Sequence, residues 1–272
     1  MSKFLDVLER IRDGVSAPLG FGATRAEKLP GIALVGLVSG SHAKGIKVAA
    51  DAAADAVIVA GAKDAGALKK MTASLKSPWG AQVSSLSEAE AQAYQENGSD
   101  MLVFNLEGTA ASALASENIA RVLCIQPGIE EAEFRAIASL PVDAYLVSMK
   151  DVSGPWTLRD LATLGSFSRR VDKYILLEVS ESPGPKDLEA LRDMGVSGLV
   201  VDVAVAGAEG LGALKTALLE MPRATSRNRT RSRAILPSSA FFPPEQPLQD
   251  DGDGDDDDDD DYSCLNRTVS SA

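Results

Sequence analysis

The chain has 272 residues, of which 45% are hydrophobic and only 5% aromatic, and its formal net charge at pH 7 is −12. This acidity argues against a nucleic-acid-binding surface, and no run of the sequence reaches the roughly 18 apolar residues of a membrane span. The N-terminal segment lacks the apolar stretch of a secretory signal and the two cysteines are expected to be reduced, so the sequence predicts a cytoplasmic protein.

The first segment, residues 1–29, combines a short helix with a Gly/Pro-rich leader. Residues 1–14 place Phe4, Leu5, Leu8 and Ile11 on one side of a helix, and this spacing predicts an amphipathic element. Such a helix is expected to bury its apolar side against the domain that follows.

Eight short apolar runs recur between residues 32 and 203 at near-even spacing. They are continuous rather than alternating, as is typical of parallel strands that are covered on both faces. Their starts lie about 21–24 residues apart, or about 31 for the sixth and seventh, which is enough chain for a strand, a helix and two loops. The runs are residues 32–38, 56–60, 79–83, 101–105, 122–126, 143–148, 174–179 and 198–203.

A helical pattern follows each run, most clearly in residues 87–96, 130–138, 186–194 and 210–219. Alternating strands and helices of this number predict an α/β fold, a (β/α)₈ or TIM barrel that spans residues 30–222. The N-terminal helix is expected to cap the bottom of this barrel.

Residues 223–272 lose all periodicity. They begin with an arginine cluster and end in an acidic block that has ten aspartates between Asp250 and Asp261. This composition predicts a disordered tail, because it offers too little apolar surface to offset the entropy of ordering. The arginines could contact nucleic acid or an acidic partner, but a solvated tail whose halves attract each other is favoured.

In such a barrel, chemistry is expected at the carboxyl ends of the strands. Gln82 and Ser84 follow the third strand there. Lys150, Glu107, Glu178 and Asp202 are the candidate catalytic residues. The candidate substrate-binding residues are Ser39, His42, Lys63, Asn105, Gln126, Ser148 and Trp156. The alternative is that strand ends are polar simply because loops begin there.

Lys150 follows the sixth strand, where partial desolvation would free its amine to attack a carbonyl group and form a Schiff base. Glu178 or Glu107 would then move the protons. The arrangement resembles class I aldolases, several of which carry their Schiff-base lysine on the sixth strand. That resemblance implies a lyase or isomerase that needs no cofactor.

The carboxylates allow a second interpretation, in which Glu107, Glu178 and Asp202 share a Mg²⁺ ion that stabilises an enolate. Lys63 and Lys150 would flank that site. Enolase-type barrels also use lysines near these strand ends, but their acidic triad on consecutive strands is not matched here.

A phosphate site after the last strands is a weaker expectation. Gly207 and Gly210 are suitably placed for it, whereas Glu181 and Glu209 would repel an anion. His42 is the only histidine, which argues against zinc sites with several histidines and against a Ser/His/Asp triad.

In strand spacing and size, the predicted barrel of residues 30–222 resembles the aldolase-type and ribulose-phosphate-binding barrels at the level of the superfamily. This resemblance implies an enzyme that acts on a small carbonyl or carboxylate substrate, and a homo-oligomer is compatible with it. The alternative from another class is a non-catalytic barrel that binds a metabolite or a protein partner.

Overall fold

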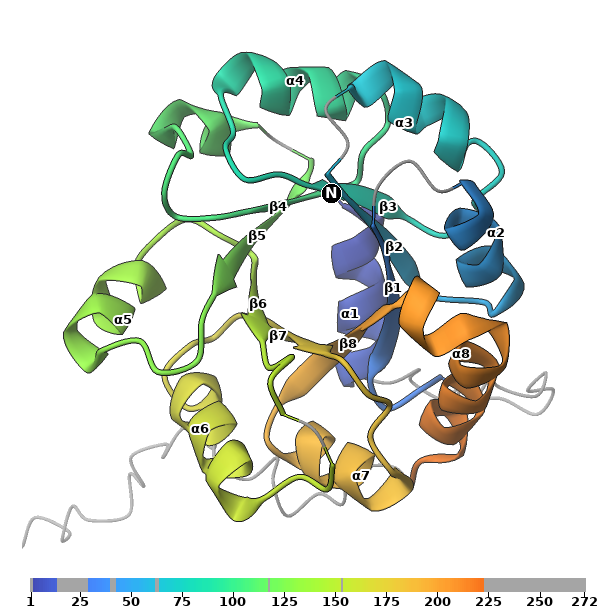
Figure 1. Cartoon of the computed structure of the whole chain (residues 1–272). Coiled ribbons are helices and arrows are strands. Elements are labelled where there is room, and N and C mark those ends of the chain that lie inside the picture. The colour runs from blue at the N-terminus through green and yellow to red at the C-terminus, as the bar shows by residue number, and fades with distance from the viewer. Residues whose placement is uncertain are drawn as a thin grey trace, which may run out of the picture. The chain divides into compact units, whose positions relative to one another are not determined.

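The computed structural model describes residues 2–13, 29–39, 43–61, 64–116, 118–152 and 154–222. Its eight parallel strands form a closed barrel in which each strand pairs with the next and β8 pairs with β1 (Figure 1). The barrel predicted from the eight apolar runs is therefore confirmed. The strands are β1 (Ala33–Ser39), β2 (Ala56–Ala60), β3 (Trp79–Gln82), β4 (Met101–Phe104), β5 (Ala120–Ile125), β6 (Ala144–Ser148), β7 (Tyr174–Val179) and β8 (Val196–Asp202).

Helices surround the barrel and cover the outer face of its sheet (Figure 1). Local sequence explains where several of them begin: Ser87 and Thr157 form capping boxes with Glu90 and Asp160, and Pro185 occupies the first turn of its helix. The outer helices are α2 (Ala43–Asp51), α3 (Ala65–Thr72), α4 (Glu88–Glu96), α5 (Glu131–Ala138), α6 (Leu158–Ser168), α7 (Pro185–Asp193) and α8 (Val203–Glu220).

The segment after β4 differs from the expected α-helix, because only a 3₁₀ helix, Ala111–Ala115, follows that strand. Its loop instead pairs with the loop after β3. The Leu86 amide donates to the Gly108 carbonyl at 3.1 Å, and the Ala110 amide donates to the Leu86 carbonyl at 2.8 Å. Backbone groups that a helix would have satisfied internally are therefore satisfied between two loops.

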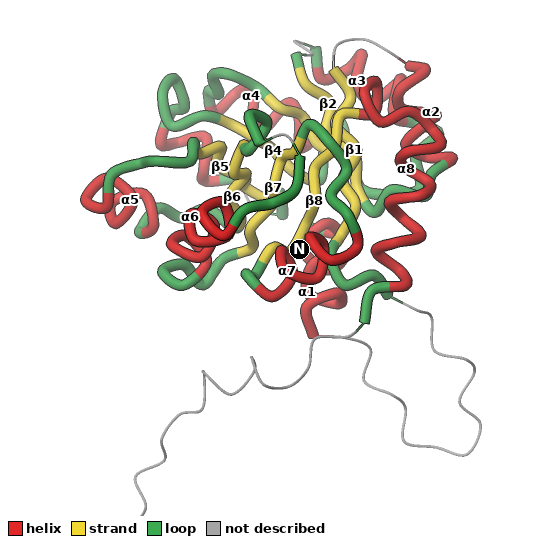
Figure 2. Tube along the Cα trace, turned by 60° about the horizontal axis from the view of Figure 1, so that its bottom comes forward, coloured by secondary structure: helices red, strands yellow, loops and turns green. Residues whose placement is uncertain are grey.

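The N-terminal helix α1 (Lys3–Asp13) covers the amino end of the barrel, as predicted (Figure 2). Phe4 and Leu8 are fully buried and join the apolar cluster inside the barrel. Asp100, which precedes β4, accepts hydrogen bonds from the backbone amides of Lys3 at 3.0 Å and Phe4 at 2.6 Å. These bonds hold the N-terminus of α1 in place, because the first amides of a helix lack partners within it.

Two further aspartates at the amino end join neighbouring strands in a similar way. Asp55 accepts from the Leu34 amide at 2.8 Å and pairs with Lys215 of α8 at 2.7 Å. Asp143 accepts from the Arg121 amide at 2.8 Å and from the Arg121 guanidinium at 2.9–3.0 Å. Each of these three carboxylates therefore has partners within the fold, which indicates a structural role.

In the described part of the chain, no helix is long and apolar enough to cross a membrane. The predicted tail (223–272) and most of the predicted leader lie outside the described residues.

Gly80 of β3 supplies a test of the packing inside the barrel. A Cβ atom added there would overlap the side chain of Met101 and lie 2.5 Å from its carbonyl oxygen. We expect Gly80→Ala to lower the free energy of unfolding by about 1–3 kcal/mol, because backbone and core must both shift. Urea denaturation followed by circular dichroism measures this change.

Gly212→Ala in α8 is the matched control, since its added Cβ would have no atom within 4 Å. Alanine favours a helix over glycine, so this variant should gain up to about 1 kcal/mol. Equal destabilisation by both substitutions would contradict the packing argument.

Candidate functional site

The barrel interior changes from apolar to polar toward the carboxyl ends of the strands. Near the amino ends it is filled by residues such as Val35, Ile58, Met101 and Val200, all of which are fully buried. In such a barrel, inward-facing side chains from alternate strands form layers. According to the strand register, the next layer toward the carboxyl ends comes from β1, β3, β5 and β7 and contains Leu37, Gln82, Cys124 and Glu178. Three of these four side chains are polar, which marks this layer as the candidate site.

A side-chain contact across the interior supports this layer. The Gln82 amide Nε2 donates a hydrogen bond to the Cys124 Sγ at 3.8 Å. Gln82 lies on β3 and Cys124 on β5, and these strands are separated by β4. Because these strands are not adjacent, the two side chains must contact each other across the interior of the barrel.

Lys150 and Glu178 form an ion pair at this end of the barrel. The Lys150 Nζ lies 2.8 Å from the Glu178 Oε1, and the two side chains are 54% and 5% exposed. This ion pair gives the buried Oε1 a charged partner. The Ser180 hydroxyl donates to the Lys150 carbonyl at 2.7 Å and joins the loops that follow β6 and β7.

Burial raises the pKa of the Cys124 thiol from 9.0 to about 11, against the opposing effect of the Gln82 hydrogen bond. The negative charge of Glu178 raises this pKa further, and the charge of Lys150 lowers it. These interactions show that Cys124 lies in the electrostatic field of the Lys150–Glu178 pair. The thiol is therefore uncharged at neutral pH.

Asp202 lies at the end of β8, where its Oδ1 accepts from the Ala204 amide at 2.8 Å and caps α8. The Ser39 hydroxyl donates to the other oxygen of this carboxylate at 3.5 Å. Gly207 breaks α8 with φ of 64° and ψ of 179°. Asp202 therefore caps the segment of α8 that precedes Gly207, and the phosphate site expected near Gly207 and Gly210 stays a prediction.

The remaining predicted residues are dispersed. Asn105, Glu107 and Gln126 are exposed in the loops after β4 and β5, and Ser148 pairs in register with Glu178. His42 and Lys63 lie outside the described residues.

The three carboxylates of the magnesium interpretation do not form a common ligand set. Within the described ranges, no group of three or more His, Cys, Asp or Glu side chains is arranged to hold a metal ion. Glu107 is exposed, Glu178 is buried in the barrel and Asp202 caps a helix.

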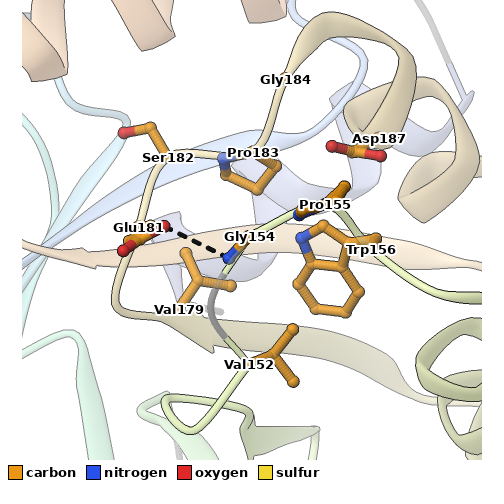
Figure 3. A pocket seen from close by; sticks show the side chains of 10 residues that line it. All are labelled: Val152, Gly154, Pro155, Trp156, Val179, Glu181, Ser182, Pro183, Gly184 and Asp187. Carbon is orange, nitrogen blue, oxygen red and sulfur yellow. Dashed lines mark hydrogen bonds between the residues drawn. The ribbon is translucent and has the colours of Figure 1, made fainter.

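Trp156 lines a cavity of about 210 Å³ between the loops that follow β6 and β7 (Figure 3). Glu181 and Asp187 line the same cavity, and the Glu181 carboxylate accepts from the Gly154 amide at 3.4 Å. The cavity therefore adjoins the loops that carry Lys150 and follow Glu178, and its charged lining side chains are acidic.

Sequence reasoning assigned no role to Gln82 or Cys124. Gln82 stands at the end of the weakest apolar run, and Cys124 resembles an ordinary core cysteine. The available signal was alternation, because both residues share the inward-facing positions of their strands.

Alkylation of Cys124 tests the burial of this layer. Since the thiolate is the nucleophile, a pKa near 11 predicts that the rate of reaction with iodoacetamide keeps rising from pH 9 to pH 11. Mass spectrometry of the Cys124 peptide measures the rate, with N-acetylcysteine as the reference and circular dichroism to confirm folding at each pH. A plateau by pH 9 would show that the thiol is not buried.

The comparisons with known proteins concern the fold. No family model matches the sequence, and no curated protein matches it either. A mutant tryptophan synthase alpha-subunit from Pyrococcus furiosus is similar in structure, with 12% identity, a TM-score of 0.54, and coverage of 70% of this chain and 97% of that one. Thiamine phosphate pyrophosphorylase from Pyrococcus furiosus is similar as well, with 13% identity and a TM-score of 0.51. This similarity covers 69% of this chain and 96% of that one.

Tryptophan synthase from M. tuberculosis is also similar, at 10% identity and a TM-score of 0.58, over 82% of this chain and 99% of that one. These similarities agree with the predicted (β/α)₈ barrel fold. At this level of identity they do not extend to a reaction.

Proposed function

We propose that the protein is an enzyme that acts on a small carbonyl compound through a Schiff base on Lys150, with Glu178 as the proton carrier. The observation that carries the proposal is the 2.8 Å contact between an accessible amine and a buried carboxylate oxygen. A nucleophile and a base within reach of each other are the minimum for covalent catalysis of this kind.

The chemistry balances with these two residues. Glu178 takes one proton from the Lys150 ammonium, and the free amine attacks the carbonyl carbon to give a carbinolamine. Glu178 returns that proton to the carbinolamine oxygen, which leaves as water while the nitrogen lone pair forms the C=N bond. The resulting iminium withdraws electrons from the adjacent carbon, so a bond at that carbon can break or form, as a lyase or isomerase requires.

The other candidate residues take no part in forming the Schiff base in this proposal. Asp202 holds the Ser39 hydroxyl at 3.5 Å and orients it at the rim. Glu107, on the exposed loop after β4, is available to a bound substrate, whereas Lys150 and Glu178 pair with each other.

Borohydride trapping tests Lys150. Incubation with small aldehydes, ketones and 2-oxo acids, then reduction, should add to Lys150 the mass of the carbonyl compound less one oxygen atom. Lys150→Arg should lose the adduct while it keeps a cation beside Glu178, because a guanidinium forms no such imine. Lys186→Arg, on an 89% exposed side chain of α7, is the control and should leave trapping unchanged. No adduct at Lys150 with any carbonyl compound would overturn the proposal in favour of a binding protein.

Glu178→Gln tests the proton carrier separately. The amide keeps the shape of the side chain but cannot accept the proton, so the rate of trapping at Lys150 should fall by about 10²–10⁴-fold. Peptide mass spectrometry over a pH series measures the rate. In the variant, trapping should recover as rising pH deprotonates the amine directly, and an unchanged pH profile would exclude Glu178 from this role.

A further inference from the structure

We infer that the substrate of this site is an uncharged hydroxylated carbonyl compound, a hydroxyaldehyde or hydroxyketone, and that Gln82 binds its hydroxyl group. The inference rests on the proposed function, since it identifies what the Lys150–Glu178 pair acts on. It excludes phosphorylated and carboxylated compounds as preferred substrates. Two sets of observations carry it, namely the hydrogen-bonding capacity of the polar layer and the charges around it.

The first set concerns Gln82. One hydrogen of its Nε2 is used by the Cys124 Sγ, so the side chain retains one N–H donor and its Oε1 acceptor. Among the described residues, Gln82 has no other side-chain partner. A hydroxyl group satisfies both functions at once, because it donates to Oε1 and accepts from the amide. A carboxylate or phosphate dianion cannot donate, and an ammonium group cannot accept.

Glu178 adds a second acceptor to the same layer. Its buried Oε1 lies 2.8 Å from the Lys150 Nζ, and a carboxylate oxygen has lone pairs for more than one donor. Glu178 and Gln82 both act on Cys124: the charge of Glu178 raises the pKa of its thiol, and Gln82 donates a hydrogen bond to its sulfur. The hydroxyl groups of a hydroxylated carbonyl compound can donate to these two acceptors, while its carbonyl group reacts with Lys150.

Among the described residues of the carboxyl end, the charges disfavour an anionic substrate. The positive charge of Lys150 is matched by Glu178 at 2.8 Å, so it is not free to bind an anion. Asp202 already accepts from the Ala204 amide at the start of α8, so this amide is not available to a phosphate. The adjoining cavity adds the carboxylates of Glu181 and Asp187. Like charges placed together in a partly enclosed site oppose binding.

A matched series of three-carbon compounds tests the substrate class by borohydride trapping on the wild-type protein. Propanal has no hydroxyl group, glyceraldehyde has two, glyceraldehyde 3-phosphate adds a phosphate, and pyruvate has a carboxylate. Each rate at Lys150 is divided by the rate of the same compound with N-α-acetyl-lysine, which removes intrinsic reactivity. We expect glyceraldehyde to exceed each of the others by about tenfold, the effect of one satisfied hydrogen bond.

The outcomes separate the two proposals. An adduct with glyceraldehyde 3-phosphate or pyruvate that forms as fast as that with glyceraldehyde overturns the inference but supports the Schiff base. The absence of every adduct at Lys150 overturns the proposed function itself.

Gln82→Met tests the specificity residue, because methionine has a similar size but no amide. The normalised rate for glyceraldehyde should fall about tenfold, and the rate for propanal should stay unchanged. Gln92→Met, on the exposed surface of α4, is the matched control and should change neither rate. Gln82→Asn, which keeps an amide on a shorter side chain, is the second variant. Its normalised trapping rate for glyceraldehyde should lie between the rates of the wild type and Gln82→Met. Equal losses for both aldehydes would assign Gln82 a structural role and overturn its place in the inference.

Discussion

The closure of eight parallel strands into a barrel is the constraint on which the rest of the structure depends. Every second side chain of each strand must then fill the interior, and the register stacks these side chains in layers. A polar group in the lower layers would be buried without water, so those layers are apolar. Because α1 covers the amino end, polar atoms of the interior can meet a ligand at the carboxyl end, and Gln82, Cys124 and Glu178 lie there.

The two ends of the barrel use carboxylates differently. At the amino end, Asp55, Asp100 and Asp143 each accept backbone amide hydrogen bonds, and two of them also pair with a cation. At the carboxyl end, Glu178 is buried and pairs with the half-exposed Lys150 at 2.8 Å. A carboxylate held by backbone amides stabilises the fold, whereas one that is paired with an accessible amine is placed to exchange a proton with it. The same residue type therefore has a structural role at one end and a candidate catalytic role at the other.

The sequence predicted the elements that depend on local pattern. Continuous apolar runs marked the eight strands, helical spacing of Phe4 and Leu8 marked α1, and the succession of β6 and β7 brought Lys150 and Glu178 to one rim. It did not predict the Gln82–Cys124 contact, because strands that are not neighbours meet only through the stagger of the closed barrel. The 3₁₀ segment after β4 was also missed, since its backbone groups are satisfied by a distant loop around Leu86. Patterns of hydrophobicity are local, while these two features are set by long-range geometry.

In the proposed reaction, the balance of charge at the mouth would let one lysine serve both the resting protein and the chemistry. With no substrate, Lys150 neutralises a carboxylate that would otherwise be buried alone, and such an uncompensated charge is strongly destabilising. When the shared proton moves to Glu178, both groups become neutral, so the amine is released without leaving a buried charge behind. An anionic ligand would compete with Glu178 for the ammonium and restore that cost, whereas a neutral ligand leaves the pair intact until the proton moves. The burial of Glu178, more than the presence of Lys150 itself, therefore links the stability of the barrel mouth to the kind of molecule that it can admit.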